Sequence, residues 1–210
     1  MSDSDPARWR RWALFVCGWA LVQFTVTALV LQFMRRHLNP WTSTLSRYLV
    51  GPGGDWLRAA YLVLALGLVL FGLFVEEDET RSRPWLPKAA YVLTGGGLAT
   101  AGLVTPPARI RNLMGEILFR LHLLGAGVAF LALTAVAVSS SWTGGGPFAR
   151  SRMRPFARGL SGSAATLVVV YAIVSPRGGG TYEKALIILL VLWMTLRWTV
   201  AVRDRLANHE

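Results

Sequence analysis

Ionisable side chains stand beside apolar sequence at two points of the chain. Glu116, Arg120 and His122 lie at the beginning of one apolar stretch, and Glu183 lies at the beginning of another. Charges inside a bilayer are costly, so such residues usually face the interior of a helix bundle or an aqueous cavity. We therefore treat His122, Glu116 and Glu183 as candidates for acid–base chemistry.

The spacing of Glu116, Arg120 and His122 places the ion pair and the histidine on different faces of one helix. Arg120 follows Glu116 by four residues, the favourable order for an ion pair on one helix. That pair either satisfies an arginine near the membrane interface or binds an anion. His122 lies about 200° around the helix from Arg120, so we expect it to point elsewhere, toward Ser46 or Tyr48. Packing and a proton-transfer or ligand-binding role both stay open for His122.

A polar segment from His37 to Asp55 separates the first two apolar stretches. Ser46 and Tyr48 offer hydroxyl groups there, and the glycines that follow suit a tight turn. We expect Ser46, Tyr48, Arg120 and His122 to line a polar pocket that binds a lipid or small amphiphile, with Arg120 on an anionic head group. A purely structural corner is the alternative for this segment.

Metal and cofactor sites are not expected. The chain has three histidines and one cysteine, Cys17, and no paired carboxylates accompany the histidines. The sequence also lacks the glycine-rich loop that binds nucleotide phosphates.

Long, mostly apolar stretches must position these residues. A helix of about 20 apolar residues spans the ~30 Å hydrocarbon core of a bilayer. The sequence predicts an all-α membrane bundle of six such helices, at about residues 12–34, 56–75, 85–104, 116–138, 159–174 and 182–202.

The predicted organisation is a basic tail (1–11), a six-helix domain (12–202) and a second tail (203–210). The two tails and the second and fourth loops together hold more of the 22 lysine and arginine residues than the first, third and fifth loops do. The positive-inside rule therefore favours cytoplasmic termini, with the pocket near the outer leaflet. We expect a multi-pass protein of the bacterial plasma membrane.

Three local features carry further expectations. Arg197 lies close enough to the end of the last span to reach the interface with its long side chain. Glu76 to Glu79 form an acidic run, expected to be a solvated helix end. Glycines in 85–104 form a small-residue face that favours close helix packing.

The composition excludes one class of partner. The net charge is +11, but the basic residues occur in short clusters between apolar blocks, which is not typical of nucleic-acid binding. Cations beside spans are typical of membrane proteins, and 53% of the residues are hydrophobic. We expect the lipid bilayer, and not nucleic acid, as the partner.

Several short motifs resemble the bacterial and archaeal membrane family catalogued as domain of unknown function 998. The hallmark of that family is Ser-x-Tyr-x-x-Gly ahead of the second helix, which Ser46, Tyr48 and Gly51 match. The resemblance covers about residues 12–200, and its further matches are Pro106, His122, Gly180, Lys184 and Trp193.

Two departures from the family pattern concern charge. Pro107 stands where the family often has an acid, and Lys184 stands where arginine is usual. A charge pair between those positions is therefore not expected here. The resemblance implies a six-helix membrane fold and no established reaction.

Three functions follow as hypotheses. The first is binding of a lipid or small amphiphile in the polar pocket. The second is an intramembrane enzyme that isomerises or cyclises an isoprenoid or lipid by acid–base chemistry. The third is a transporter or channel subunit, in which a homo-oligomer builds a pore at its interfaces.

Overall fold

The computed structural model describes residues 6–76, 85–104, 113–143, 147–149 and 151–207, with the backbone alone at 6 and 174–179. All regular structure in these residues is helical. The order is α1 (Pro6–Met34), the 3-10 helix η1 (Leu45–Leu49), α2 (Gly54–Phe74), α3 (Trp85–Leu103), α4 (Leu113–Trp142) and α5 (Arg154–Ala207).

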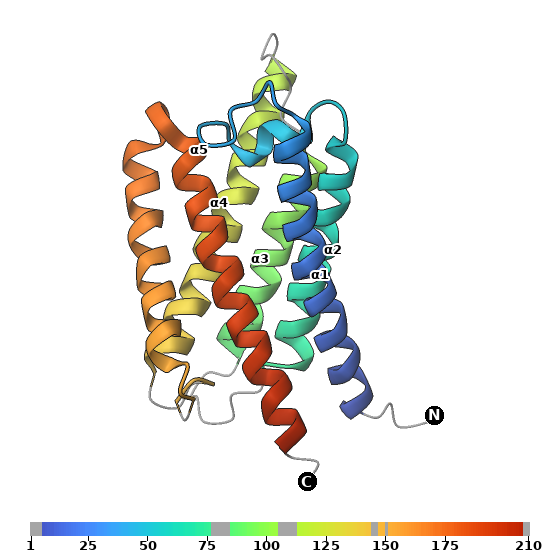
Figure 1. The fold of residues 1–210 in the computed structure, drawn as a ribbon, viewed down its shortest axis with the longest axis vertical. Coiled ribbons are helices and arrows are strands. Elements are labelled where there is room, and N and C mark those ends of the chain that lie inside the picture. The colour runs from blue at the N-terminus through green and yellow to red at the C-terminus, as the bar shows by residue number, and fades with distance from the viewer. Residues whose placement is uncertain (1–5, 77–84, 105–112, 144–146, 150, 208–210) are drawn as a thin grey trace.

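α5 is a helical hairpin. Figure 1 shows its first half, Arg154–Ile173 in orange, beside its second half, Gly180–Ala207 in red, running in the opposite direction. With α1 to α4 these halves make six helices. Five of them are long and apolar enough to cross a membrane. The prediction of an all-α membrane bundle is therefore confirmed, and the chain is a multi-pass membrane protein.

The helices run past the predicted apolar stretches. α1 begins at Pro6, α4 extends over Leu113–Trp142, and α5 begins at Arg154. α3 is the one of the six that is not among these candidate spans, because Pro87, Lys88 and its glycines lower its mean hydropathy. Packing against both α2 and α4 compensates for this low apolarity.

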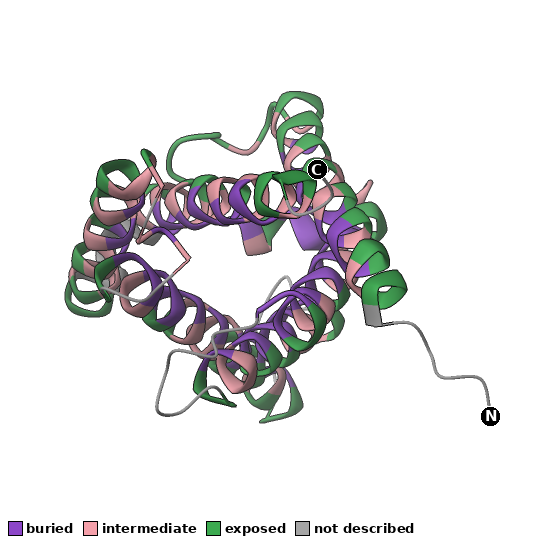
Figure 2. Cartoon of the chain, turned by 90° about the horizontal axis from the view of Figure 1, so that it is seen from below, coloured by how far each residue is buried: buried purple, intermediate pink, exposed green. Residues whose placement is uncertain are grey.

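Five helices form a ring. α1 to α4 pack in chain order, and α5 contacts both α4 and α1. Figure 2 shows the buried faces turned toward the centre of this ring. The first half of α5 lies outside the ring and is the least buried of the candidate spans.

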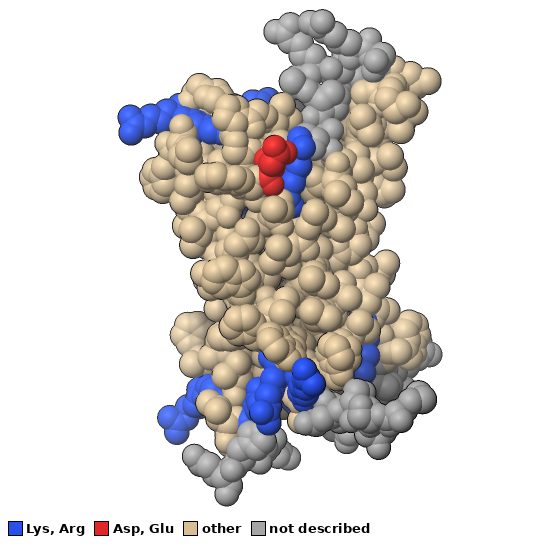
Figure 3. Space-filling view, turned by 90° about the vertical axis from the view of Figure 1, so that its right-hand side faces the viewer, with Lys and Arg blue, Asp and Glu red and all other residues tan. Residues whose placement is uncertain are grey.

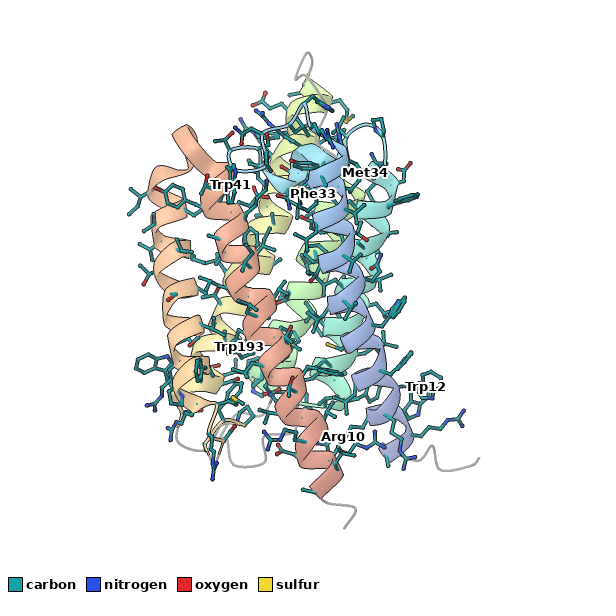
Figure 4. The ribbon with its side chains drawn as sticks, in the orientation of Figure 1. Arg10, Trp12, Phe33, Met34, Trp41 and Trp193 are labelled. Atoms are coloured by element: carbon teal, nitrogen blue, oxygen red, sulfur yellow. The ribbon has the colours of Figure 1, made fainter. Side chains whose placement is uncertain are left out.

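Both termini lie at one end of the bundle in Figure 1, which we name the terminal end. The segment 35–53 and the turn of α5 lie at the opposite end, which we name the loop end. Figure 3 shows lysine and arginine side chains at both ends of one face and a belt without charge between them. Trp12 and Trp41 are exposed at opposite ends, as Figure 4 shows, and aromatic side chains favour such interfacial positions.

Glycines let α3 approach its neighbours closely. A Cβ on Gly97 would lie 2.5 Å from the carbonyl oxygen of Gly125 in α4. A Cβ on Gly102 would lie 2.9 Å from the Cβ of Tyr61 in α2. The predicted packing role of these glycines is confirmed at both contacts, whereas Gly96 has no neighbour within 4 Å of its Cβ position.

A buried ion pair near the terminal end corrects two expectations. The Nη2 atom of Arg197 lies 2.9 Å from Oε2 of Glu76, and both residues are at most 5% exposed. The guanidinium also lies over the ring of Phe71. Arg197 therefore does not reach the interface, and Glu76 is not solvated, because each compensates the other inside the bundle. Residues 77–79 of the acidic run lie outside the described residues.

Candidate functional site

The segment 35–53 closes the loop end of the ring. Gly53 precedes α2 with a φ of 75°, a left-handed conformation that favours glycine. A Cβ on Gly54 would collide with the carbonyl oxygen of Leu49, so the chain needs glycine where it turns from η1 into α2. The turn packs η1 against α1, α2 and α5.

Arg35 holds the carbonyl groups at the end of η1. Its Nη1 atom donates to the carbonyl oxygens of Tyr48 at 3.3 Å and Val50 at 2.5 Å, with a longer contact to Arg47 at 3.4 Å. Cations are favourable beside the unpaired carbonyl groups at a helix end. The residue that stops the first apolar stretch therefore also fixes the loop that follows.

Tyr48 is fully buried beneath two cations. The Arg35 guanidinium lies 5.7 Å and the Lys184 ammonium 5.3 Å from the centre of its ring. Its hydroxyl has no hydrogen-bond partner within the described part of the chain. Burial raises the pKa of Tyr48, and the charge of Arg35 opposes this shift. The hydroxyl therefore stays protonated at neutral pH and is free to donate.

The beginning of the second half of α5 contacts three consecutive residues of this segment and binds the carbonyl groups of two of them. Lys184 Nζ donates to the carbonyl oxygen of Pro40. Thr181 Oγ1 donates to that of Trp41 at 2.7 Å. The backbone of Thr42 lies against Gly180, where a side chain would collide with it.

Glu183 joins the same two elements from inside the bundle. Its Oε1 atom accepts the backbone N–H of Leu45 at 3.0 Å, and the backbone of Ser46 also bonds to the carboxylate. The residue is 8% exposed. The carboxylate therefore pairs with the first N–H groups of η1, which have no partner within that helix.

A cavity of about 60 Å³ lies in the middle of the ring with Glu183 in its wall. The other lining residues are almost all apolar, and they come from α1 to α4 and the second half of α5. Phe24, Tyr61, Leu98, Phe130 and Met194 are examples. Glu183 to Met194 is a rise of about 16 Å along a helix. The space is thus narrow and apolar, with one carboxylate among its lining residues.

The other predicted site residues also lie at the loop end but do not converge. Arg120 and Glu116 form the predicted pair at 2.5 Å, with side chains 76% and 46% exposed. The Nδ1 atom of His122 lies 2.9 Å from the carbonyl oxygen of Ala101 and 3.0 Å from that of Val104. His122 therefore bonds to the end of α3 and not to Ser46 or Tyr48.

Ser46 Oγ lies 2.9 Å from Thr44 Oγ1 within the loop. Of the six predicted site residues, the structure brings Ser46, Tyr48 and Glu183 together, with Lys184 beside them. The pair Glu116–Arg120 stands apart on the exposed beginning of α4. Pro106 and Pro107 lie outside the described residues.

Sequence reasoning missed Arg35 and Thr181. Arg35 looked like an ordinary charge after a span, and its position just ahead of a turn-rich segment was the available signal. Thr181 gave no signal, because its partner lies 140 residues away. Among the described residues no group of three histidine, cysteine or carboxylate side chains could hold a metal ion.

The comparison with protein families agrees with this architecture. The family model described as "Protein of unknown function (DUF998)" matches residues 7–199. No curated protein and no solved structure gives a significant match. The match takes in every helix that builds the ring, the loop end and the cavity, so the chain belongs to the DUF998 family of membrane proteins.

Proposed function

We propose that the chain binds a lipid or small amphiphile inside the ring, with its apolar tail in the cavity and its polar group at Glu183. One observation carries this proposal: a buried carboxylate lines a cavity whose other walls are almost all apolar. Burying a carboxylate is costly unless hydrogen bonds or charges compensate it. The N–H of Leu45 supplies part of that compensation. A ligand that donates a hydrogen bond supplies more.

The length of the cavity indicates the kind of tail. Glu183 and Met194 are eleven residues apart on one helix, about 16 Å, roughly the length of an extended chain of ten to twelve carbon atoms. A single alkyl or isoprenoid chain matches this length, and because the cavity of about 60 Å³ is smaller than such a chain, the surrounding side chains must move apart to admit it. Ser46 and Tyr48 lie in the loop segment next to Glu183 and Lys184. The Tyr48 hydroxyl has no hydrogen-bond partner among the described residues and can donate to a head group.

Arg120 and His122 keep more limited roles in this proposal. Arg120 is exposed at the loop end, where it can contact an anionic head group that lies outside the ring. His122 fixes the end of α3 beside the cavity wall formed by Ala101. If both termini face the cytoplasm of a bacterium, the polar end of the ligand lies near the outer leaflet of the plasma membrane.

Glu183→Gln tests the proposal. The variant keeps an oxygen that accepts the N–H of Leu45 but removes the negative charge. The probes are decylamine, decanol and decanoate, added to the full chain in lipid nanodiscs, with the rise in Tm as the measure of binding. We expect decylamine and decanol to bind better than decanoate. The variant should lose about tenfold or more in decylamine affinity, since hydrogen bonds to charged groups contribute ~1.5–3 kcal/mol.

Glu116→Gln is the matched control, because it removes an exposed carboxylate at the same end of the bundle. It should bind all three probes as the parent chain does. Equal binding of the probes by the parent chain and the Glu183→Gln variant would refute the proposal.

Acid–base catalysis is a second candidate, favoured by the position of the same carboxyl group. Of the three catalytic candidates, Glu183 lines the cavity, while Glu116 is exposed and His122 is bonded to α3. A protonated Glu183 can give its proton to one carbon of an isoprenoid double bond. The carboxylate then takes a proton from a neighbouring allylic carbon, which moves the double bond and restores the acid.

This reaction predicts double-bond isomers when geranylgeraniol is incubated with the purified chain. The Glu183→Gln variant should form none of them, while Glu116→Gln should form as much as the parent chain. Products identical to those of a protein-free bilayer would exclude this chemistry for that substrate class.

A further inference from the structure

A second apolar recess lies on the outside of the ring, and it is independent of the cavity function proposed above. This groove runs between α1 and the second half of α5 and has a volume of about 490 Å³. Its α1 wall extends from Phe15 to Val26, and its α5 wall includes Thr195 and Trp198. Phe15, Trp19 and Val22 are each more than half exposed there, so the groove opens outward.

The polar atoms of the groove already have partners inside the protein. Thr25 Oγ1 donates to the carbonyl oxygen of Leu21, and Thr195 Oγ1 donates to that of Val191. Trp198 Nε1 donates to the carbonyl oxygen of Leu14. A molecule bound in the groove therefore contacts only apolar surface. Leu21 lines both the groove and the central cavity, and so separates the two spaces.

The length of the groove matches one leaflet. Phe15 to Val26 is a rise of about 16 Å, close to half of the ~30 Å hydrocarbon core. The groove is centred on α1, and its end at Phe15 is the one nearer to the terminal end. An acyl chain that enters beside Phe15 would therefore run from the side of the two termini to about the middle of the helix.

Three arginines follow the groove beyond its apolar part. Arg11 and Arg8 precede Phe15 by four and seven residues, so they share its face of α1. Arg205 follows Trp198 by seven residues on α5 and shares its face in the same way. No ion pair within the described residues involves these three arginines. Basic residues just beyond the end of a span attract anionic lipid head groups.

We propose that this groove is a binding site for an anionic phospholipid of the leaflet that faces the termini. One acyl chain fills the groove along Phe15–Val26. The phosphate and its negative charge lie against Arg8, Arg11 and Arg205. The apolar groove gives the site its depth, and the arginines distinguish an anionic head group from a zwitterionic one.

The experiment measures how much phosphatidylglycerol and phosphatidylcholine the detergent-purified full chain retains, by native mass spectrometry at matched lipid concentration. The parent chain should prefer phosphatidylglycerol. The double variant Arg11→Gln with Arg205→Gln should weaken that binding about tenfold, since each cation near an anionic lipid surface contributes measurably. Glycerol phosphate, which has the head group without a chain, should not compete.

Two controls separate the site from general surface charge and from a second copy of the chain. The double variant Arg152→Gln with Arg203→Gln removes the same charge, and Arg203 lies about 200° around the helix from Arg205. It should keep the phosphatidylglycerol preference. Val22→Trp should fill the groove and lower retention, whereas Val30→Trp on the same helix should not.

Equal retention of the two lipids, or an equal loss in both double variants, would overturn the proposal. Unchanged retention in Val22→Trp would also overturn it, because the chain would then lie elsewhere. A dimer that dissociates in Val22→Trp without any change in lipid retention would assign the groove to a second copy instead.

Discussion

At the scale of single residues, two ion pairs of this protein differ in their surroundings. Glu116 and Arg120 pair on an exposed helix surface, which i, i+4 spacing alone predicts. Glu76 and Arg197 pair across the bundle with side chains 2% and 6% exposed. The second pair is 121 residues apart in the chain, so no local pattern reveals it. Its stability consequences differ accordingly.

Arg197→Leu should lower the free energy of unfolding by about 3–5 kcal/mol, because it leaves the Glu76 carboxylate buried without its partner. The double variant Glu76→Leu with Arg197→Leu should recover much of that loss, since no charge then remains buried. Tm measured in nanodiscs checks both variants.

The matched control is Glu116→Leu with Arg120→Leu, together with its single variants. An exposed pair contributes about 0–1 kcal/mol, so all three should have Tm values close to that of the parent chain. A single Arg197 variant that is as stable as the exposed-pair variants would show that the buried pair does not stabilise the fold.

At the scale of elements, α3 depends on contact with its neighbours more than on its own apolarity. Gly97 sits against the backbone of α4, with Gly125 opposite. Small residues let helices approach closely in a membrane, where packing contributes much of the association. The glycines therefore lower the hydropathy of α3 but allow it to pack closely against its neighbours.

Gly97→Ala should destabilise the fold by about 1–3 kcal/mol, the usual cost of forcing an extra carbon into a packed interior. Its Cβ would lie 2.5 Å from the Gly125 carbonyl oxygen. Gly96→Ala is the control on the next residue, with no neighbour within 4 Å. It should leave Tm unchanged or slightly raised, because alanine favours a helix over glycine. Equal Tm values in the two variants would contradict this account of the α3–α4 contact.

The bounds of the elements show what sequence patterns can supply. Long apolar stretches predicted the six helices, because a bilayer tolerates backbone amides only when they are paired within the segment. The helix ends extend beyond those stretches, since polar side chains outside the hydrocarbon do not stop a helix. The path of residues 35–53 was not predictable. Its contacts come from Arg35, Thr181, Glu183 and Lys184, and the sequence pattern gives the order of the helices that carry them but not how those helices are arranged in space.

At the scale of the whole molecule, the sequence indicated which residues belong to the loop end but not how they meet. Glu183 was one of three acid–base candidates, and the cavity distinguishes it from Glu116 and His122. His122 was expected near Tyr48, yet it bonds to carbonyl groups of α3. A helical angle tells which residues share a face, whereas the neighbour of that face depends on the arrangement of all the helices.

The second half of α5 contacts the rest of the bundle at both ends, through Glu183 and Thr181 at one and Arg197 at the other. It leaves the ribosome after α1 to α4, so its partners in the segment 35–53 and at Glu76 are made much earlier. Until it inserts, three groups lack the partners that they have in the folded protein: the N–H of Leu45, the carbonyl of Trp41 and the carboxylate of Glu76. The ring is therefore completed in the membrane only when the second half of α5 inserts, and a chain interrupted before residue 180 would present those groups to quality-control proteases.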